Sequence, residues 1–144
     1  MSETRSPELF GSHWVTPTGT ALNRAWKLFQ GRAGPYFELR RHVLKLAYFP
    51  SGSVDSQVVD IDWDWITGTG EEGIGELRIS DVIGGQDNLR VIFFLANQVR
   101  SNEPLPRIWI LTVLQKKNQR FSPNELRTFA AAKKLIILRH YGFK

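Results

Sequence analysis

The residues whose types and spacing could perform chemistry are cations in the C-terminal half of the chain. Lys116, Lys117 and Arg120 fall within five positions, and Arg90 lies in a strand that we expect to pair with residues 107–114. If these side chains converge, they can hold a phosphodiester, because cations stabilise a phosphorane and a lysine with a lowered pKa can act as general base. A ribose 2′-OH would then be the nucleophile, with no metal required. Spacing alone, however, favours cations that only solvate a sheet edge.

Charge is unevenly divided along the chain, whose formal net charge is +5. Residues 1–72 carry seven Lys and Arg against nine Asp and Glu, whereas residues 73–144 carry twelve against five. A basic half of this kind suggests a polyanionic partner, most plausibly nucleic acid, although a solvated cationic helix face is a common alternative. The cations that we assign to RNA binding are Arg78, Arg127, Lys133 and Lys134.

Acidic residues in the first half of the chain are candidate ligands for a metal ion, but the residues around them disfavour such a site. Asp60, Asp62 and Asp64 alternate with apolar residues, and Glu71 stands where a calcium loop has its bidentate acid. The glycine that such a loop needs is replaced by Trp65, so a solvated strand face that offsets the positive half is the better interpretation. The three histidines are scattered, and cysteine and glycine-rich phosphate loops are lacking. We therefore expect neither a metal site nor a cofactor.

The elements that must position the cations are predicted most clearly near the C-terminus. Residues 107–114 form a near-continuous apolar run, typical of a strand covered on both faces. Ser122, Pro123 and Glu125 predict a helix start with a capping box, and Gly142 predicts its end. One face of this helix is mostly apolar. The turn that carries the cations thus joins a buried strand to a capped helix.

The remaining pattern predicts an α+β domain. Three strands in succession, followed by a helix, favour an antiparallel sheet. Residues 35–49 have helix-like spacing, although residues 42–49 could equally be a strand, and residues 13–15 could be a short edge strand. We expect a flexible lead-in over residues 1–12 and a single domain over 13–144, with these further elements: a helix from Thr20 to Gly31, an alternating strand over 58–66 with one buried face, and strands over 76–80 and 89–95.

No stretch of the sequence approaches the length of a transmembrane helix, and the polar N-terminus lacks the apolar core of a signal peptide. We therefore expect no membrane partner and a cytoplasmic location.

Four segments together resemble the HigB/RelE toxin superfamily, and its phage-derived HigB-like branch in particular. They are Glu76-Leu-Arg78, Leu89–Phe94, Ile110–Lys117 and the helix start Ser122-Pro123. No single motif is diagnostic, but their order and spacing match over roughly residues 73–144. The resemblance implies a RelE-like fold: a small antiparallel-dominated sheet with two N-terminal helices and a C-terminal helix.

The resemblance also implies a function. Members of the superfamily are small cytoplasmic toxins that cleave mRNA without a metal, usually in the ribosomal A site, and a cognate antitoxin neutralises them. Arg90 matches the strand arginine that contacts the scissile phosphate. Lys116 and Lys117 match the paired cations that end the last strand, and Arg120 follows in the same turn. The partners implied are mRNA, the ribosome and an antitoxin of helix-turn-helix type.

This chain departs from the family pattern where proton transfer is concerned. Thr112 and Leu114 replace a frequent His and Phe, and Phe93 replaces a frequent Tyr. Tyr141 or His140 is a candidate replacement from the helix end. These departures motivate an alternative function, a non-catalytic RNA- or protein-binding module on the same scaffold. The first 70 residues do not align, which leaves the 58–66 strand as a candidate insertion.

Overall fold

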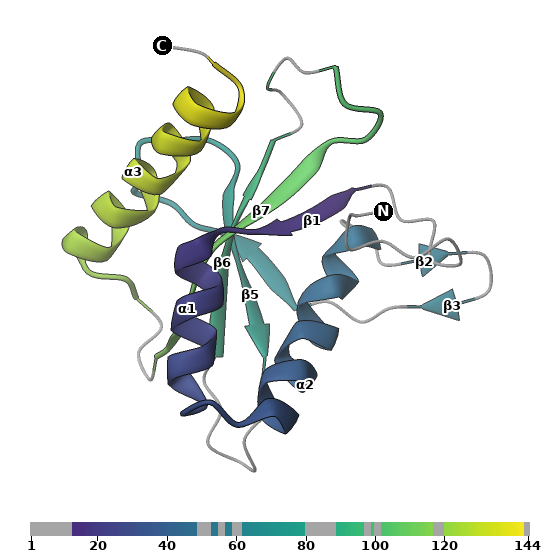
Figure 1. Ribbon diagram of the computed structural model, residues 1–144. Coiled ribbons are helices and arrows are strands. Elements are labelled where there is room, and N and C mark those ends of the chain that lie inside the picture. The colour runs from purple at the N-terminus through teal and green to yellow at the C-terminus, as the bar shows by residue number, and fades with distance from the viewer. Residues whose placement is uncertain are drawn as a thin grey trace.

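The computed structural model describes residues 13–48, 53–54, 57–58, 62–79, 89–96, 99, 102–116 and 120–142. The predicted lead-in over 1–12 lies outside these residues. The elements in chain order (Figure 1) are β1 Trp14–Pro17, α1 Gly19–Leu28, α2 Ala33–Val43, the 3₁₀ helix η1 Leu44–Tyr48, β2 Ser53–Val54, β3 Gln57–Val58, β4 Trp63–Trp65, β5 Ile74–Ile79, β6 Leu89–Leu95, β7 Arg107–Gln115 and α3 Pro123–His140.

The main sheet has five strands in the order β1-β7-β6-β5-β4. The β4–β5, β5–β6 and β6–β7 pairs are antiparallel, which confirms the predicted succession of antiparallel strands. β1 pairs in parallel with β7, so the sheet is mixed and the possible strand at 13–15 is real. β2 and β3 form a separate two-stranded sheet.

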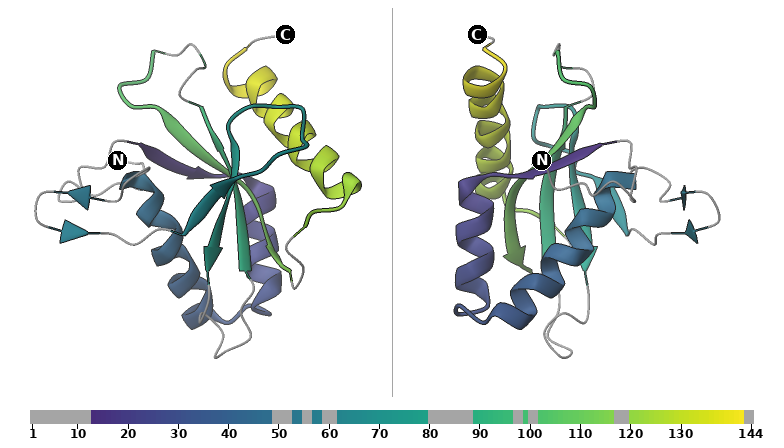
Figure 2. Two further views of the ribbon diagram at one scale, coloured as in Figure 1. Left: turned by 180° about the vertical axis from the view of Figure 1, so that it is seen from behind. Right: turned by 45° about the vertical axis from the view of Figure 1, so that its right-hand side comes forward.

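Helices cover both faces of the sheet. α1, α2 and η1 pack against one face, in a core that includes Phe29, Leu46 and Phe93. α3 packs against the other face, where Phe129 meets Phe94 and its neighbours. Figure 2 shows α2 and α3 on opposite sides of the strands in both views. This layering explains why β7, which lies between two strands and two helical layers, is buried from Ile108 to Val113, as its apolar run predicts.

The C-terminal helix begins as its sequence predicts. The Ser122 hydroxyl accepts a hydrogen bond from the Glu125 backbone N–H, and the Glu125 carboxylate accepts one from the Ser122 N–H, so the capping box is confirmed. Pro123 occupies the first helical turn. Gly142 follows the helix with a φ of +75°, a conformation that glycine adopts without strain.

The α+β class is confirmed, but the finer arrangement differs from the predicted one. β1 precedes the two N-terminal helices and turns the antiparallel-dominated sheet into a mixed one. The described part of the segment 35–49, residues 35–48, is helical, with α2 running into η1. The RelE-like identity of the fold stays a prediction.

The prediction of one alternating strand over 58–66 is wrong in its extent. Val58 ends β3, which pairs only with β2, while β4 begins at Trp63 and pairs with β5. β4 is an edge strand, and its outer Trp65 remains 43% exposed instead of lying on a buried face. Residues 59–61, with Asp60, lie outside the described part of the chain.

Candidate functional site

A charged cluster occupies the α3 face of β5 and β6, beside the first turn of α3. Residues of a strand alternate between faces, so Glu76 and Arg78 share the face of Ile74, which packs in the α3 core. Arg78 lies directly opposite Arg90 of β6. Like charges placed opposite each other are unfavourable. The acidic side chains around these two arginines therefore determine what the cluster can do.

Glu76 balances the two arginines. Its Oε1 lies 3.0 Å from Arg90 Nε and its Oε2 lies 3.5 Å from Arg78 Nη1. Glu76 and Arg90 are 9% and 6% exposed, so this is a buried ion pair. Arg78 is more open and also binds Asp62 at 2.8 Å. Asp62 therefore offsets a cation of the positive half, as the acidic strand face was expected to do.

The Glu76 carboxylate retains hydrogen-bonding capacity. Burial raises the pKa of Glu76 above its ordinary value, and the charges of Arg78 and Arg90 only partly oppose that rise. The Arg90 contact lacks hydrogen-bond geometry, so among the residues that the structure describes Glu76 Oε1 has no hydrogen-bond partner. A carboxylate with a raised pKa can take a proton from a bound hydroxyl group.

A cavity of about 300 Å³ opens at this carboxylate. Its size is at the lower end of small-ligand sites. Glu76 lines the cavity together with the exposed Arg120 from the turn before α3. The structure thus brings three of the predicted cations to one region, since Arg78 and Arg90 both contact Glu76. The cavity is lined by Trp65, Ile66, Thr67, Glu76, Arg120, Phe121 and Leu126.

The lysines of the predicted site have different surroundings. Lys116 Nζ lies 3.0 Å from Glu125 Oε1 and 5.3 Å from the centre of the Phe121 ring. It therefore joins the end of β7 to the capping box of α3, and among the described residues its ion-pair partner is Glu125, not Glu76. Lys117 lies outside the described residues.

The cations assigned to RNA binding do not converge. Lys133 and Lys134 both pair with Glu71, at 3.2 and 3.5 Å, and so connect α3 to the segment before β5. Arg127 is exposed and donates a hydrogen bond to the Asn124 side chain. Of the four, only Arg78 belongs to the charged cluster. An RNA-binding role for the other three stays a prediction.

Glu76 was not predicted as a site residue, although Glu76-Leu-Arg78 is one of the four segments on which the family resemblance rests. The available signal was an acidic side chain within an otherwise apolar strand, on the same face as an arginine two residues later. Its contact with Arg90 was not readable, because it depends on the register between β5 and β6.

Tyr141 and His140, the candidate replacements for the missing proton-transfer group, lie away from the charged cluster. Both side chains pack against Trp109, with Trp109 Nε1 donating a hydrogen bond to the Tyr141 hydroxyl. Trp109 pairs with Phe94, four residues along β6 from Arg90, which corresponds to roughly 13 Å. Burial also raises the pKa of Tyr141.

Two further features bear on the class of chemistry. Within the described ranges, no three His, Cys, Asp or Glu side chains are grouped so that they could hold a metal ion. None of the described helices is both long and apolar enough to cross a membrane.

Comparisons of the chain with protein-family models, with curated proteins and with solved structures find no match. The resemblance to the HigB/RelE superfamily therefore stays a prediction from sequence.

Proposed function

We propose that this protein is a metal-independent endoribonuclease of toxin type, which cleaves mRNA at the cavity beside Glu76. The observation that carries the proposal is the buried carboxylate with a raised pKa, placed between two arginines at the floor of a cavity with a third arginine at its edge. Acid–base catalysis of RNA cleavage needs a group that accepts a proton and cations that stabilise the phosphorane. The cluster supplies both kinds of group.

In the proposed reaction Glu76 accepts the proton of the ribose 2′-OH, and the 2′ oxygen attacks the adjacent phosphorus. The bond to the 5′ oxygen breaks, a 2′,3′-cyclic phosphate forms, and a proton passes to the leaving 5′ oxygen. Arg120 holds the phosphate, while Arg78 and Arg90 stabilise its added negative charge. We assign the proton on the leaving group to the lysine turn, Lys116 and Lys117, which the sequence resemblance implicates.

The partners that follow from this proposal are mRNA, with the ribosome where cleavage is ribosome-associated, and a neutralising antitoxin of helix-turn-helix type. The location is the cytoplasm. The resemblance in the β5, β6 and β7 sequences supports these assignments.

The test is induced expression in a bacterial host, with mRNA ends mapped by primer extension. Wild type is compared with Arg120→Ala, with Glu76→Gln and with the double substitution of Lys116 and Lys117 by Ala. We expect growth arrest and new cuts within translated messages for the wild type, and at least about a hundredfold less cleavage for Glu76→Gln, the contribution typical of a general base.

The matched control is Arg24→Ala, which removes an exposed cation on α1, on the opposite side of the sheet. It should arrest growth like the wild type. Full cleavage by Arg120→Ala and Glu76→Gln, with both variants folded, would contradict the proposal.

One observation favours a non-catalytic alternative. Arg90 and Lys116 are already neutralised within the chain, by Glu76 and Glu125, and can therefore be scaffold residues. An RNA-binding module on the same scaffold would bind RNA in a salt-sensitive way without cutting it. Cleavage by the pure protein in the presence of ribosomes would exclude this alternative.

A further inference from the structure

An apolar groove lies on the other face of the molecule, between α1 and α2. The two helices form a V (Figure 1), and β1 and β7 close its floor. The groove contains a cavity of about 60 Å³. A water-sized group needs about 10–15 Å³ on this measure, so the cavity admits about four to six such groups, close to the size of a leucine side chain. It is lined by Val15, Pro17, Ala21, Leu22, Ala25, Tyr36, Leu39, Arg40, Val43, Leu44, Ile110 and Val113.

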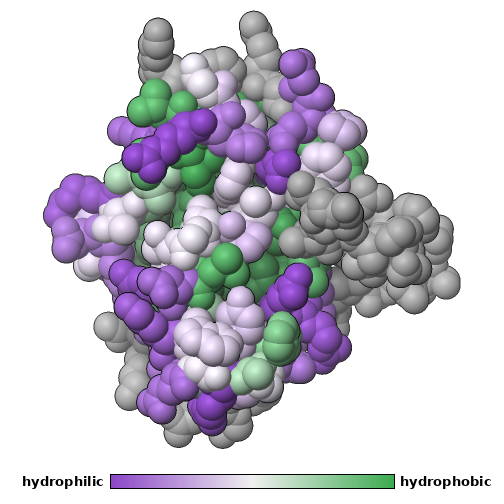
Figure 3. Space-filling model, in the orientation of Figure 1, coloured by the Kyte–Doolittle hydropathy of each residue, from purple (hydrophilic) through white to green (hydrophobic). Residues whose placement is uncertain are grey.

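Large apolar side chains remain exposed around this groove. Leu22 and Trp26 of α1 are 44% and 46% exposed, and Phe37 of α2 is 55% exposed. Tyr36 links them, since its ring contacts Trp26 at 5.3 Å and Phe37 at 5.4 Å between centroids. Figure 3 shows hydrophobic and near-neutral residues between the two helices, with hydrophilic residues on either side. A continuous apolar patch rimmed by polar residues is typical of an interaction site.

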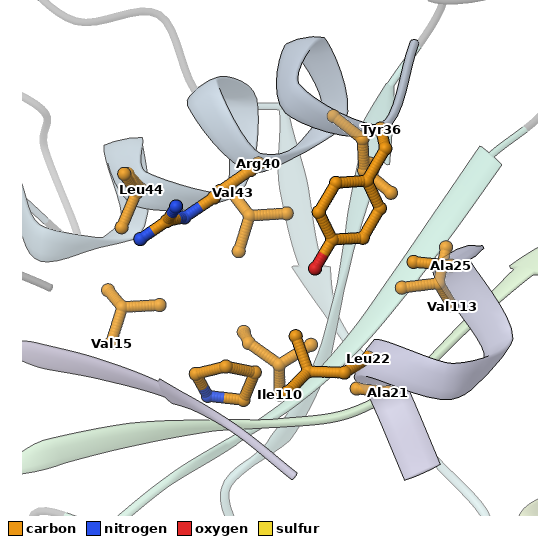
Figure 4. Close-up of a pocket in the computed structure, with 12 residues that line it drawn as sticks. Val15, Ala21, Leu22, Ala25, Tyr36, Arg40, Val43, Leu44, Ile110 and Val113 are labelled. Atoms are coloured by element: carbon orange, nitrogen blue, oxygen red, sulfur yellow. The ribbon is translucent and has the colours of Figure 1, made fainter. Parts of the chain in front are cut away.

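Two polar groups, the Arg40 guanidinium and the Tyr36 hydroxyl, lie at the groove. Figure 4 shows the Arg40 side chain extending along α2 toward Leu44 at the edge of the cavity, and the Tyr36 hydroxyl pointing into the cavity. Among the residues that the structure describes, neither the Arg40 guanidinium nor the Tyr36 hydroxyl has an ion-pair or hydrogen-bond partner. The neighbouring acid, Glu38, is bound to Arg41 instead. A ligand that brings an apolar side chain to the cavity would therefore gain from a carboxylate beside it.

The charge around the groove points in the same direction. Residues 13–48 contain six Lys and Arg and a single acid, Glu38. A second copy of the chain would bring this cationic surface against itself in a two-fold dimer, because such an interface uses the same patch on both subunits. An acidic partner complements the surface.

We propose that the groove between α1 and α2 binds an acidic amphipathic helix of a second protein. In this arrangement a leucine of the partner fills the cavity, and a Glu or Asp one turn away pairs with Arg40 and hydrogen-bonds the Tyr36 hydroxyl. Helices recognise hydrophobic grooves through apolar anchors at three- and four-residue spacing. The proposal is independent of the ribonuclease proposal, because the groove lies on the opposite face of the sheet.

The test uses the full chain and two synthetic peptides of about 18 residues, long enough to form a helix. Both carry leucines at positions i, i+3, i+4 and i+7, with alanines between, and they differ in having Glu or Lys at the polar positions. Binding is measured by isothermal titration calorimetry and by intrinsic tryptophan fluorescence, to which Trp26 contributes. We expect the acidic peptide to bind and the basic peptide not to bind.

Variants locate the site. Arg40→Glu should weaken binding of the acidic peptide by about tenfold or more, as expected for loss of a charge-assisted bond. Arg24→Glu makes the same change in charge on the side of α1 that does not line the groove, and should leave binding within about twofold. Ala25→Leu adds volume at the cavity and should abolish binding, and a cooperative thermal transition measured on the same variant shows that it is folded.

Three results would overturn the proposal. The first is equal binding of the acidic peptide by Arg40→Glu and Arg24→Glu. The second is competition of single-stranded RNA with the acidic peptide in the wild type together with loss of RNA binding in Ala25→Leu, which would assign the groove to RNA. The third is self-association of the wild type that Ala25→Leu removes, which would make a second copy the occupant.

Discussion

At the scale of single residues, two opposing electrostatic effects act on Glu76 in the charged cluster. Burial disfavours its ionised form, yet Arg78 and the buried Arg90 require a negative charge beside them. The net result is a raised pKa, so the burial cost outweighs the attraction. Glu125 is the opposite case, since the Ser122 backbone hydrogen bond and Lys116 lower its pKa. The contributions of these two carboxylates to the free energy of unfolding should therefore change with pH in opposite directions.

The first prediction concerns this pH dependence. Because the pKa of Glu76 is raised above its ordinary value near 4.5 in the folded state, its contribution to stability is present below that value and is lost as the pH rises through the folded pKa. Relative to Glu76→Gln, the free energy of unfolding of the wild type should fall as the pH rises from 4.5. Urea denaturation over a series of pH values measures the difference.

Glu125→Gln provides the control with the opposite sign. Its lowered folded pKa gives stability that is present above the ordinary value and lost as the pH falls through the folded pKa. The same slope for both variants would contradict the assignment for Glu76.

At the scale of elements, the cluster depends on how β5 and β6 pair. Arg78 and Arg90 face each other across the two strands, and Glu76 reaches Arg90 along the diagonal. This arrangement is one unit: each charge is tolerated because its neighbours are present. A buried ion pair costs desolvation on both sides, so loss of one partner is worse than loss of both.

The second prediction is therefore non-additivity. Arg90→Leu or Glu76→Leu alone should each destabilise the fold by roughly 3 kcal/mol, because the remaining charge is buried without its partner. The double variant should be less destabilised than either single variant, since Arg78 keeps Asp62 as a partner. Urea denaturation of the four proteins closes the cycle. Additive losses would show that the two side chains do not act as a pair.

At the scale of the whole molecule, the sheet separates two surfaces of different character. The α3 face carries the charged cluster and its polar cavity, whereas the face of α1 and α2 carries the apolar groove. Because the two surfaces lie on opposite faces of the sheet, a ligand bound at one does not cover the other. An RNA at the cavity and a protein at the groove could thus bind at the same time.

The third prediction tests the polyanion site through salt. Binding of a 2′-O-methylated single-stranded RNA, which cannot be cleaved through its 2′ oxygen, should weaken with added salt as counterions are released. Arg120→Ala should lower the slope of log affinity against log salt by about 0.7, the value for one phosphate contact on a single strand. Fluorescence anisotropy measures this slope. Arg24→Ala should leave it unchanged, and an equal reduction by both variants would place the RNA elsewhere.

The sequence by itself determined the features whose signals are local. The Ser122–Glu125 capping box, the apolar run of β7 and the succession of antiparallel strands were all readable, because caps and periodicity act over a few residues. The α+β class followed from them. The extent of the 58–66 strand was misread, because alternation does not reveal which sheet a strand joins.

Only the tertiary structure decided which charges meet. Glu76 reaches Arg90 through strand register, and Lys133 reaches Glu71 through the docking of α3. The parallel pairing of β1 with β7 and the groove between α1 and α2 are likewise contacts between segments distant in sequence. Such contacts depend on the packing of whole faces, for which the sequence carries no local mark. The candidate cations were therefore predictable as a set, but their partners were not.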